Sequence, residues 1–303
     1  MLPIVHHPDY TAPMPSGHRF PMDKFRRVMQ RLLTEGIVRS EQVHRPEPAS
    51  RSQLLTVHGE AYVDAILNQT LTSDLVRRIG LPITPAVARR AVAATGGTLL
   101  TARLALNHGL ACNTAGGSHH GFADYGSGFC VFNDVATAAA ILLQEGSIER
   151  VLVVDLDVHQ GDGTAKIFEG EPAVFTFSIH CRTNFPARKQ ESDLDIALEP
   201  GIGDETYLRI LADSLPDLLS QHRPDLVFFN AGVDPHHRDK LGRLALSDTG
   251  LHDREHFVLT TCLRQAIPVA GVLGGGYVED LDHLANLHTI LHQTATNVLP
   301  GLG

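Results

Sequence analysis

Three short and nearly uniform apolar runs constrain the fold of this chain more than any other feature. They are VLVV at 151–154, LVFF at 226–229 and VAGVL at 269–273. Runs of this kind are typical of strands that are buried on both faces, as in parallel sheets. Stretches with helical apolar spacing lie between them, so strands alternate with helices. The sequence therefore predicts an α/β protein in which helices flank a central, mostly parallel sheet in three layers.

The expected elements follow this alternation. Strands are predicted at 2–6, 109–113, 151–154, 173–179, 226–230 and 269–273, and helices at 22–33, 60–67, 85–106, 134–144, 164–168, 205–221, 254–265 and 281–298. Pro85 suits the first turn of the longest helix, and Gly109 suits its end. The loop-like stretch 45–51 is too short to separate domains. We therefore expect one domain that spans 1–303.

Polar clusters lie at or just beyond the ends of the predicted strands. They are HH at 119–120, DLDVHQGD at 155–162, NAGVD at 230–234 and GGGY at 274–277. Open α/β sheets place their ligand sites at the carboxyl ends of the strands. Four clusters that are far apart in sequence are thus expected to converge on one pocket.

The segment 155–162 carries the strongest chemical signal. Alternation along an extended strand would put Asp155, Asp157 and His159 on one side and turn Leu156 toward the core. Three such groups at the end of a buried strand are costly unless they are paired or bind a metal. Carboxylate and imidazole ligands suit Zn²⁺. The competing interpretation is a helix N-cap with satisfied hydrogen bonds.

A catalytic zinc usually takes three protein ligands and leaves one position open. Asp234 follows another apolar strand and is the natural third ligand beside Asp157 and His159. By itself, an Asp before Pro is more often a turn residue.

The adjacent histidines of the GGSHHG loop are then free for acid–base chemistry. Asp155 and Asp162 would each orient one of the two imidazoles, His119 and His120. The alternative for this loop is a polar surface segment.

Two glycine-rich segments complete the predicted site. In GGGY, the Tyr277 hydroxyl can donate a hydrogen bond to an oxyanion, although a turn with a capping aromatic is the alternative. In GSGFCVF at 126–132, Phe129 beside Gly128 could form a narrow apolar wall, although core packing is the commoner role of such a fragment.

Composition excludes some classes of function. The net charge of −9 argues against a general nucleic-acid binder. Four scattered cysteines without a CxxC pair indicate a reducing compartment. The start of the chain does not read as a signal peptide, and the longest apolar run, 135–143, is far shorter than the roughly 20 residues that span a bilayer. We expect a cytoplasmic protein without membrane insertion.

Taken together, these segments resemble the histone deacetylase family, which has the arginase/deacetylase fold. GGSHH, GFCVFND, DLDVHQGDGT, FSIH, NAGVD and GGGY occur in the order and spacing of that family, over nearly the whole chain. DLDVHQGDG and the stretch at 239–247 look most like the class IV enzymes and their bacterial relatives. The resemblance implies zinc-dependent hydrolysis of the amide bond of N-ε-acyl-lysine, acetyl or longer fatty acyl, which releases lysine and a carboxylate.

The resemblance also implies a role for each site residue. The implied zinc ligands are Asp157, His159 and Asp234. His120 would act as general base and then as general acid, with His119 as its electrostatic partner, and Tyr277 would polarise the carbonyl. Asp155 would orient His119, and Asp162 would orient His120. The substrate would contact Gly128, Phe129, Phe185 and Gly275. A potassium ion would lie at Asp155, Asp157, His159, Ser178 and Ile179, and a second, weaker cation site is implied near Phe168 and Val174.

Alternatives to an acyl-lysine hydrolase stay open at this point. An enzyme acting on acetylpolyamines or other small acylamines would use the same chemistry. An arginase-like ureohydrolase would need two bridged metals and more carboxylates than the PHHRD that follows Asp234 offers. A non-catalytic binder of acyl-lysine is the alternative from another class. Two departures from the family pattern are the missing Tyr-Asp pair near 80–82 and Gln160, where many members carry a second histidine.

Overall fold

A computed structural model of the chain describes residues 1–299, and the last four residues of the predicted domain 1–303 lie outside this range. The helices of the described part are α1 (Lys24–Thr34), α2 (Arg51–Leu54), α3 (Glu60–Leu67), α4 (Ser73–Ile79), α5 (Pro85–His108), α6 (Asp134–Gln144), α7 (Asp162–Ile167), α8 (Asp204–His222), α9 (Asp248–Arg264) and α10 (Leu281–Val298). Short 3₁₀ turns lie at η1 (Pro8–Tyr10) and η2 (Ser40–Gln42).

The strands form one sheet, and every strand pair in it is parallel. They are β1 (Ile4–Val5), β2 (Val43–His44), β3 (Leu110–Asn113), β4 (Val151–Asp155), β5 (Val174–Cys181), β6 (Leu194–Leu198), β7 (Leu226–Asn230) and β8 (Val269–Val272). Their order is β2-β1-β3-β8-β7-β4-β5-β6. The predicted α/β class with a central parallel sheet is confirmed.

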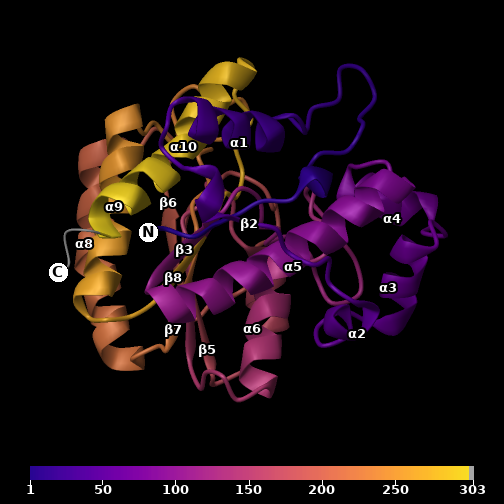
Figure 1. Cartoon of the computed structure of the whole chain (residues 1–303), viewed down its shortest axis with the longest axis horizontal. Helices are drawn as coiled ribbons and strands as arrows, with labels where there is room; N and C mark the ends of the chain where they lie inside the picture. Colours follow the sequence, from indigo (N-terminus) through magenta and orange to yellow (C-terminus); the bar gives the residue numbers. More distant parts are fainter. Residues whose placement is uncertain (300–303) are drawn as a thin grey trace.

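Each central strand packs on both faces, which explains its uniform apolar sequence. In β4, Leu152 and Val154 belong to one buried cluster, while Val151 and Val153 belong to another on the opposite face. This alternation follows from the period of two along a strand. Helices α1, α8, α9 and α10 lie on one side of the sheet, whereas α5 and α6 lie on the other, and α2 to α4 extend beyond them (Figure 1). The three layers are thus helix, sheet and helix.

Helix boundaries follow local capping signals. Helix α5 begins after Thr84, whose side chain accepts a hydrogen bond from the Val87 amide at 3.2 Å, and it ends before Gly109 in the left-handed conformation, with φ of 79°. Helices α3, α6 and α10 and strand β7 have the predicted limits. Helix α9 begins six residues before the predicted start at Arg254, because Ser247 caps it by accepting from the Gly250 amide at 3.0 Å.

Besides the two 3₁₀ turns, four elements of residues 1–299 had no counterpart in the prediction: α2, α4, β2 and β6. Each is short or lies at an edge. β6 pairs only with β5 among the described strands, and its sequence LDIAL is broken by Asp195 and mostly half-buried. An edge strand that faces solvent has no need of a uniform apolar run, so the signal that marked β4 and β7 is absent from it.

The four cysteines, Cys112, Cys130, Cys181 and Cys262, are free and buried. None of the helices within residues 1–299 combines the length and the apolar character needed to cross a membrane.

Candidate active site

The loops that follow β3, β4, β7 and β8 meet at the carboxyl edge of the sheet. The strand register puts Asp155, the last residue of β4, beside Ser178 of β5 and Asn230 of β7. All four polar clusters of the sequence follow these strands. The parallel topology therefore brings together residues that lie more than 150 positions apart, such as His119 and Tyr277.

Asp157, His159 and Asp234 are buried in this group of loops, and one ligand atom of each lies within 4.8 Å of the others. The His159 Nδ1 atom lies 2.9 Å from Asp157 Oδ1 and 3.1 Å from Asp234 Oδ2. The predicted extended strand through 155–159 is wrong beyond Asp155, since β4 ends there and the chain bends. The His159 amide donates to Asp157 Oδ1 at 3.0 Å, and this hydrogen bond between residues two positions apart stabilises the bend.

The remaining oxygens of the two carboxylates show how the group is held. The Gly275 amide donates to Asp157 Oδ2 at 2.6 Å, and the Val158 amide donates to Asp234 Oδ1 at 2.8 Å. Asp234 Oδ2 is buried, and its polar neighbour within residues 1–299 is His159 Nδ1 at 3.1 Å, an atom that also lies 2.9 Å from Asp157 Oδ1. A buried carboxylate oxygen that shares its one donor in this way is costly unless a cation satisfies it. Two carboxylates and one imidazole form a donor set that fits Zn²⁺.

The pKa of Asp234 is a second indication of a cation site. Burial, and then the neighbouring Asp157 carboxylate, raise the pKa of Asp234 to about 7. Asp234 is therefore incompletely compensated by the side chains around it, as expected for a carboxylate that binds a metal ion.

Gly275 lies directly behind these acids. A Cβ atom at this position would lie 2.0 Å from Asp234 Oδ2 and 2.7 Å from Asp157 Oδ2. Only glycine allows the backbone to approach the carboxylates so closely. Gly275, predicted as a substrate contact, thus lies against two of the candidate metal ligands and is not among the residues that line the cavity described below.

His119 and His120 each form a pair with a carboxylate. His119 Nδ1 lies 2.6 Å from Asp155 Oδ2, and His120 Nδ1 lies 2.5 Å from Asp162 Oδ1. The centroids of the His119 and His120 rings are 4.1 Å apart. A carboxylate that accepts from Nδ1–H leaves Nε2 of the neutral ring able to take a proton. The pairing of each imidazole with its own acid is the arrangement expected from the sequence.

Their surroundings give the two imidazoles different charges. Burial lowers both pKa values, but the Asp155 and Asp157 carboxylates outweigh it at His119 and raise its pKa to about 9. At His120, burial and the nearby His119 outweigh Asp162 and lower the pKa to about 4. In this set of side chains His119 is cationic near neutral pH, whereas His120 is neutral. A neutral imidazole is the form that a general base requires.

Tyr277 lies across the cavity from the histidine pairs, with its ring 6.2 Å from that of His159. Its amide donates to Asp239 Oδ2 at 2.6 Å, and Asp239 Oδ1 accepts from the Leu241 and Gly242 amides. These bonds tie the loop after β8 to the loop after β7. Burial, and then Asp234 and Asp157, raise the pKa of Tyr277 well above its usual value. The hydroxyl therefore stays protonated and can donate.

A cavity of about 390 Å³ opens over these groups. It is lined by Arg19, Arg78, Ile79, Gly80, His120, Gly128, Phe129, His159, Thr183, Asn184, Phe185, Leu241, Arg243 and Tyr277. A Cβ atom at Gly128 would lie 2.6 Å from His120 Cδ2 and 3.0 Å from Phe185. The wall is therefore tight at this point, and Phe129 and Phe185 make it aromatic.

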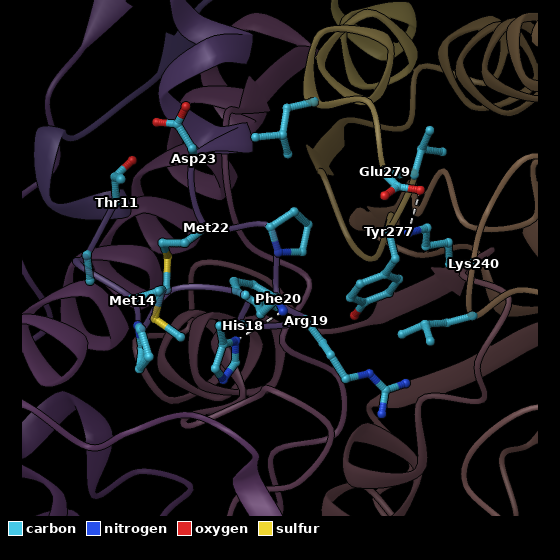
Figure 2. Close-up of a pocket in the computed structure, with 17 residues that line it drawn as sticks. Thr11, Met14, His18, Arg19, Phe20, Met22, Asp23, Lys240, Tyr277 and Glu279 are labelled. Atoms are coloured by element: carbon cyan, nitrogen blue, oxygen red, sulfur yellow. Dashed lines mark hydrogen bonds and ion pairs between the residues drawn. The ribbon is translucent and has the colours of Figure 1, made fainter.

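A second cavity of about 590 Å³ adjoins the first and shares Arg19, Leu241 and Tyr277 with it (Figure 2). The loop 11–23 forms one side, and the ion pair between Lys240 and Glu279 lies on the other. It contains neither histidine–carboxylate pair and none of the three candidate metal ligands.

Several supporting residues were not predicted from the sequence. Asn230 donates to Asp155 Oδ1 at 2.9 Å, while Asp134 accepts from the Gly117 and Ser118 amides at 3.0 and 2.6 Å. Lys24 is buried, and its Nζ donates to the Gly274 carbonyl at 3.2 Å. The NAGVD motif gave a signal for Asn230, because it stands at the carboxyl end of a strand. Nothing local marks Asp134 or Lys24, since their partners are distant in sequence.

Gln160, one of the two departures from the family pattern, is held by hydrogen bonds that explain its place in the structure. Its side-chain amide donates to the Gln190 carbonyl at 2.7 Å and to Asp195 at 2.9 Å, and its Oε1 accepts from the Gln190 amide at 2.9 Å. Gln160 thus connects the loop that carries His159 to the segment that leads into β6.

A buried ion pair lies beneath the same loop. Arg254 and Glu255 are fully buried on α9 and are joined by two hydrogen bonds of 2.7 Å. Arg254 also donates to the carbonyl of Leu156, between Asp155 and Asp157, at 3.0 Å. Arg254 therefore connects α9 to the backbone that carries the candidate ligands.

Glu255→Ala is expected to lower the free energy of unfolding by about 3–5 kcal/mol, because it leaves the Arg254 charge buried without its partner. Urea denaturation measures this change. Asp213→Ala, an exposed acid on α8, is the control and should change stability by less than about 0.5 kcal/mol. An equally small change for Glu255→Ala would contradict the assigned role of the pair.

Of the five residues predicted to bind potassium, Asp157 and His159 are also candidate zinc ligands, and the other three lie on β4 and β5. Asp155 and Ser178 are register partners on β4 and β5, and Ile179 follows Ser178. The Ser178 hydroxyl lies 3.0 Å from His180 Nδ1. Phe168 and Val174, near the second predicted cation site, lie at the end of α7 and the start of β5.

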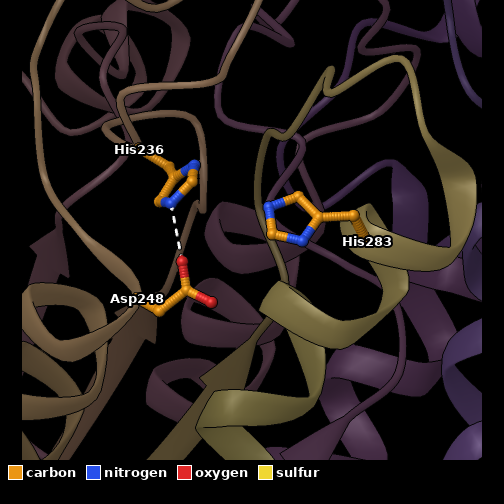
Figure 3. A group of neighbouring side chains, drawn as sticks. All are labelled: His236, Asp248 and His283. Atoms are coloured by element: carbon orange, nitrogen blue, oxygen red, sulfur yellow. Dashed lines mark hydrogen bonds and ion pairs between the residues drawn. The ribbon is translucent and has the colours of Figure 1, made fainter.

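A second His/Asp group, formed by His236, Asp248 and His283, also has ligand atoms within 4.8 Å of one another (Figure 3). His236 Nδ1 accepts from the Arg238 amide at 3.3 Å, so its Nε2 carries the proton that it donates to Asp248 at 2.9 Å. Asp248 and His283 lie in the first turns of α9 and α10, where the helix dipole disfavours a cation. We interpret this group as a hydrogen-bonded pair beside a histidine.

Comparison with known proteins agrees with this fold and site. A profile of the histone deacetylase domain matches residues 18–293. An uncharacterized protein of Picosynechococcus sp. is 55% identical, over 98% of this chain and 99% of its own. Histone deacetylase 2 of Arabidopsis thaliana is 29% identical, and the matched region covers 86% of this chain and 70% of that protein. The acetoin utilization protein AcuC of Staphylococcus aureus is 28% identical, and the matched region covers 80% of this chain and 67% of AcuC.

The crystal structure of the HDA15 HD domain superimposes with a TM-score of 0.82 over 99% of this chain and 88% of that one, at 23% identity, and so shows the same fold. The chain belongs to the histone deacetylase family. Family membership indicates a hydrolase of the deacetylase type that depends on a metal ion.

Proposed function

We propose that this protein is a zinc-dependent hydrolase that removes acetyl or longer acyl groups from the ε-amine of lysine. The observation that supports it most strongly is the convergence of three kinds of group at one cavity floor. These are the Asp157, His159 and Asp234 donor set, the neutral His120, and the protonated Tyr277. Amide hydrolysis needs an electrophile, a base and an oxyanion donor, and these groups correspond to the three.

A bound Zn²⁺ would polarise the acyl carbonyl and lower the pKa of a water molecule in the site. His120 accepts the proton of the attacking water at Nε2, while Asp162 holds the ring through Nδ1. His119, held by Asp155, supplies positive charge beside the reacting atoms. The Tyr277 hydroxyl donates a hydrogen bond to the developing oxyanion. His120 then gives its proton to the departing lysine amine.

The aromatic wall suits the alkyl chain of an acyl-lysine. Gly128 leaves room between His120 and Phe185, and Phe129 is packed by Phe20 at 5.3 Å and Tyr277 at 5.9 Å. The proposal includes potassium at Asp155, Asp157, His159, Ser178 and Ile179, because the register of β4 and β5 places Asp155 beside Ser178, and the loop with Asp157 and His159 follows directly. It also includes a cytoplasmic location, which the four free cysteines support.

The proposal is tested with zinc-loaded protein and lysine peptides that carry acetyl, octanoyl or myristoyl groups, with acetylputrescine alongside. We expect one zinc per chain by elemental analysis and hydrolysis of at least one acyl-lysine peptide. Asp234→Asn should lower the bound zinc, and this readout does not depend on activity.

The profile of kcat/KM across the acyl groups also reports the depth of the cavity. A preference for the longer chains would make the enzyme a defatty-acylase, in line with the resemblance to class IV. Turnover of acetylputrescine alone would contradict the lysine assignment. Two manganese ions per chain would instead support ureohydrolase chemistry.

A further inference from the structure

The mouth of the catalytic cavity is positively charged in a chain that is negatively charged as a whole. Arg19, Arg78 and Arg243 line the cavity, and no aspartate or glutamate does. The chain carries 34 acidic residues against 25 lysines and arginines. A cluster of one sign at the entrance, opposite to the net charge, selects the charge of what enters.

The three arginines come from three separate segments. Arg19 lies in the loop before α1, Arg78 lies in the last turn of α4, and Arg243 lies in the loop after β7. All three side chains are exposed. They therefore surround the opening instead of forming one stripe along a helix, which would be the pattern of an ordinary solvated face.

Their charges are not neutralised by the protein. None of the three forms an ion pair with a carboxylate among residues 1–299. The guanidinium of Arg78 stacks over the Tyr125 ring at 3.7 Å, and that of Arg243 lies 3.5 Å from the Thr183 hydroxyl. Neither contact cancels a positive charge.

Three acids on segments next to the cavity lining already have partners. Asp74 pairs with Arg77 on α4, and Glu279 pairs with Lys240. Asp239 accepts from three backbone amides, among them that of Tyr277. Lys189 adds a further positive charge next to Phe185, because its Nζ is bonded to the Asn184 and Pro186 carbonyls at 2.7 and 2.6 Å.

From this arrangement we infer that the enzyme selects acyl-lysine in an acidic peptide context, with carboxylates close to the acylated residue, and discriminates against cationic substrates. This inference rests on the proposed function. It names the substrate class of the same site. It also predicts weak binding of acetylated polyamines and of lysine-rich peptides, because their positively charged amines would approach the three arginines. Charge pairs at an exposed rim act mainly through long-range attraction and weaken with salt.

The test measures binding to the zinc-loaded full chain, so that it does not depend on turnover. Fluorescent peptides carry a non-hydrolysable methyl-ketone isostere of acetyl-lysine, flanked on both sides by two glutamates, two glutamines or two lysines. At 50 mM salt, we expect the acidic peptide to bind about tenfold more tightly than the basic one, the order expected for a few exposed charge pairs. At 500 mM salt this ratio should fall below about threefold.

The triple variant Arg19→Gln, Arg78→Gln, Arg243→Gln is expected to reduce the ratio to within about twofold. Each single variant should reduce it partially. Arg264→Gln is the matched control, because this exposed arginine ends α9 and is not among the residues that line the cavity. It should keep the full ratio.

Equal affinity for the three peptides, or a preference that survives the triple variant, would overturn the inference. The same peptides with true acetyl-lysine are assayed in parallel for hydrolysis. Acid-selective binding without any hydrolysis supports the inference and refutes the proposed function. Hydrolysis without charge selectivity refutes the inference and leaves the proposed function intact.

Discussion

His120→Ala is expected to lower kcat for hydrolysis of an acyl-lysine peptide by about 10²–10⁴-fold, the contribution of a positioned general acid–base group. The expectation follows from the Asp162 bond that orients the ring and from the lowered pKa that keeps it neutral. The decrease should appear in kcat and in kcat/KM alike, since the residue acts on the reacting atoms. Steady-state kinetics on zinc-loaded protein measure it.

Two further variants make this test specific. His119→Ala should lower kcat less, because His119 is assigned an electrostatic role and not the transfer of the proton. His256→Ala, an exposed histidine on α9, should turn over like the parent chain. Bound zinc is measured for each protein, so that loss of the metal is separated from loss of the base. A larger defect in His119→Ala than in His120→Ala would exchange the two roles.

Tyr277→Phe should lower kcat by about 10²–10³-fold, the usual scale for one oxyanion donor. The substitution removes only the hydroxyl, because the ring keeps its contacts with Phe20 and Phe129 at centroid distances of 6.5 and 5.9 Å. KM should change little, since the lost hydrogen bond forms in the transition state. The measurement is the kinetics of the same acyl-lysine peptide.

Tyr207→Phe is the matched control, because Tyr207 is a fully buried tyrosine of α8 that does not line the cavity. It should retain the kcat of the parent chain. If Tyr277→Phe turned over at a rate close to that of the parent chain, the oxyanion would have to be stabilised by other groups, and the assignment of this tyrosine would be wrong.

The three arginines that line the cavity entrance, Arg19, Arg78 and Arg243, affect the choice of substrate for these experiments. A substrate rich in lysine would bind weakly by the inference above, so a low rate could reflect its flanking charges and not its acyl group. Acyl-chain comparisons are therefore best made within one acidic peptide. The same design separates chain-length preference, which depends on Phe129 and Phe185, from charge selection at the rim.

The sequence by itself determined the elements whose signals are local. The limits of α5 depend on a cap and two residues with special backbone geometry, all within or next to the helix. The buried strands β4 and β7 were evident because their first four residues are all apolar, as expected when both faces of a strand are covered. The polar clusters at the ends of such strands were evident as a site because parallel strands share one carboxyl edge.

The tertiary structure alone decided which side chains meet across long separations. Arg254 reaches the Leu156 carbonyl over 98 residues, and Arg19, Arg78 and Arg243 surround one opening from three segments. Helix α4, which carries Arg78, was not predicted. The physical reason is that capping and periodicity act within a few residues, whereas these contacts depend on how finished elements pack. A lone arginine in a loop or a short helix looks the same in sequence whether it faces solvent or a catalytic cavity.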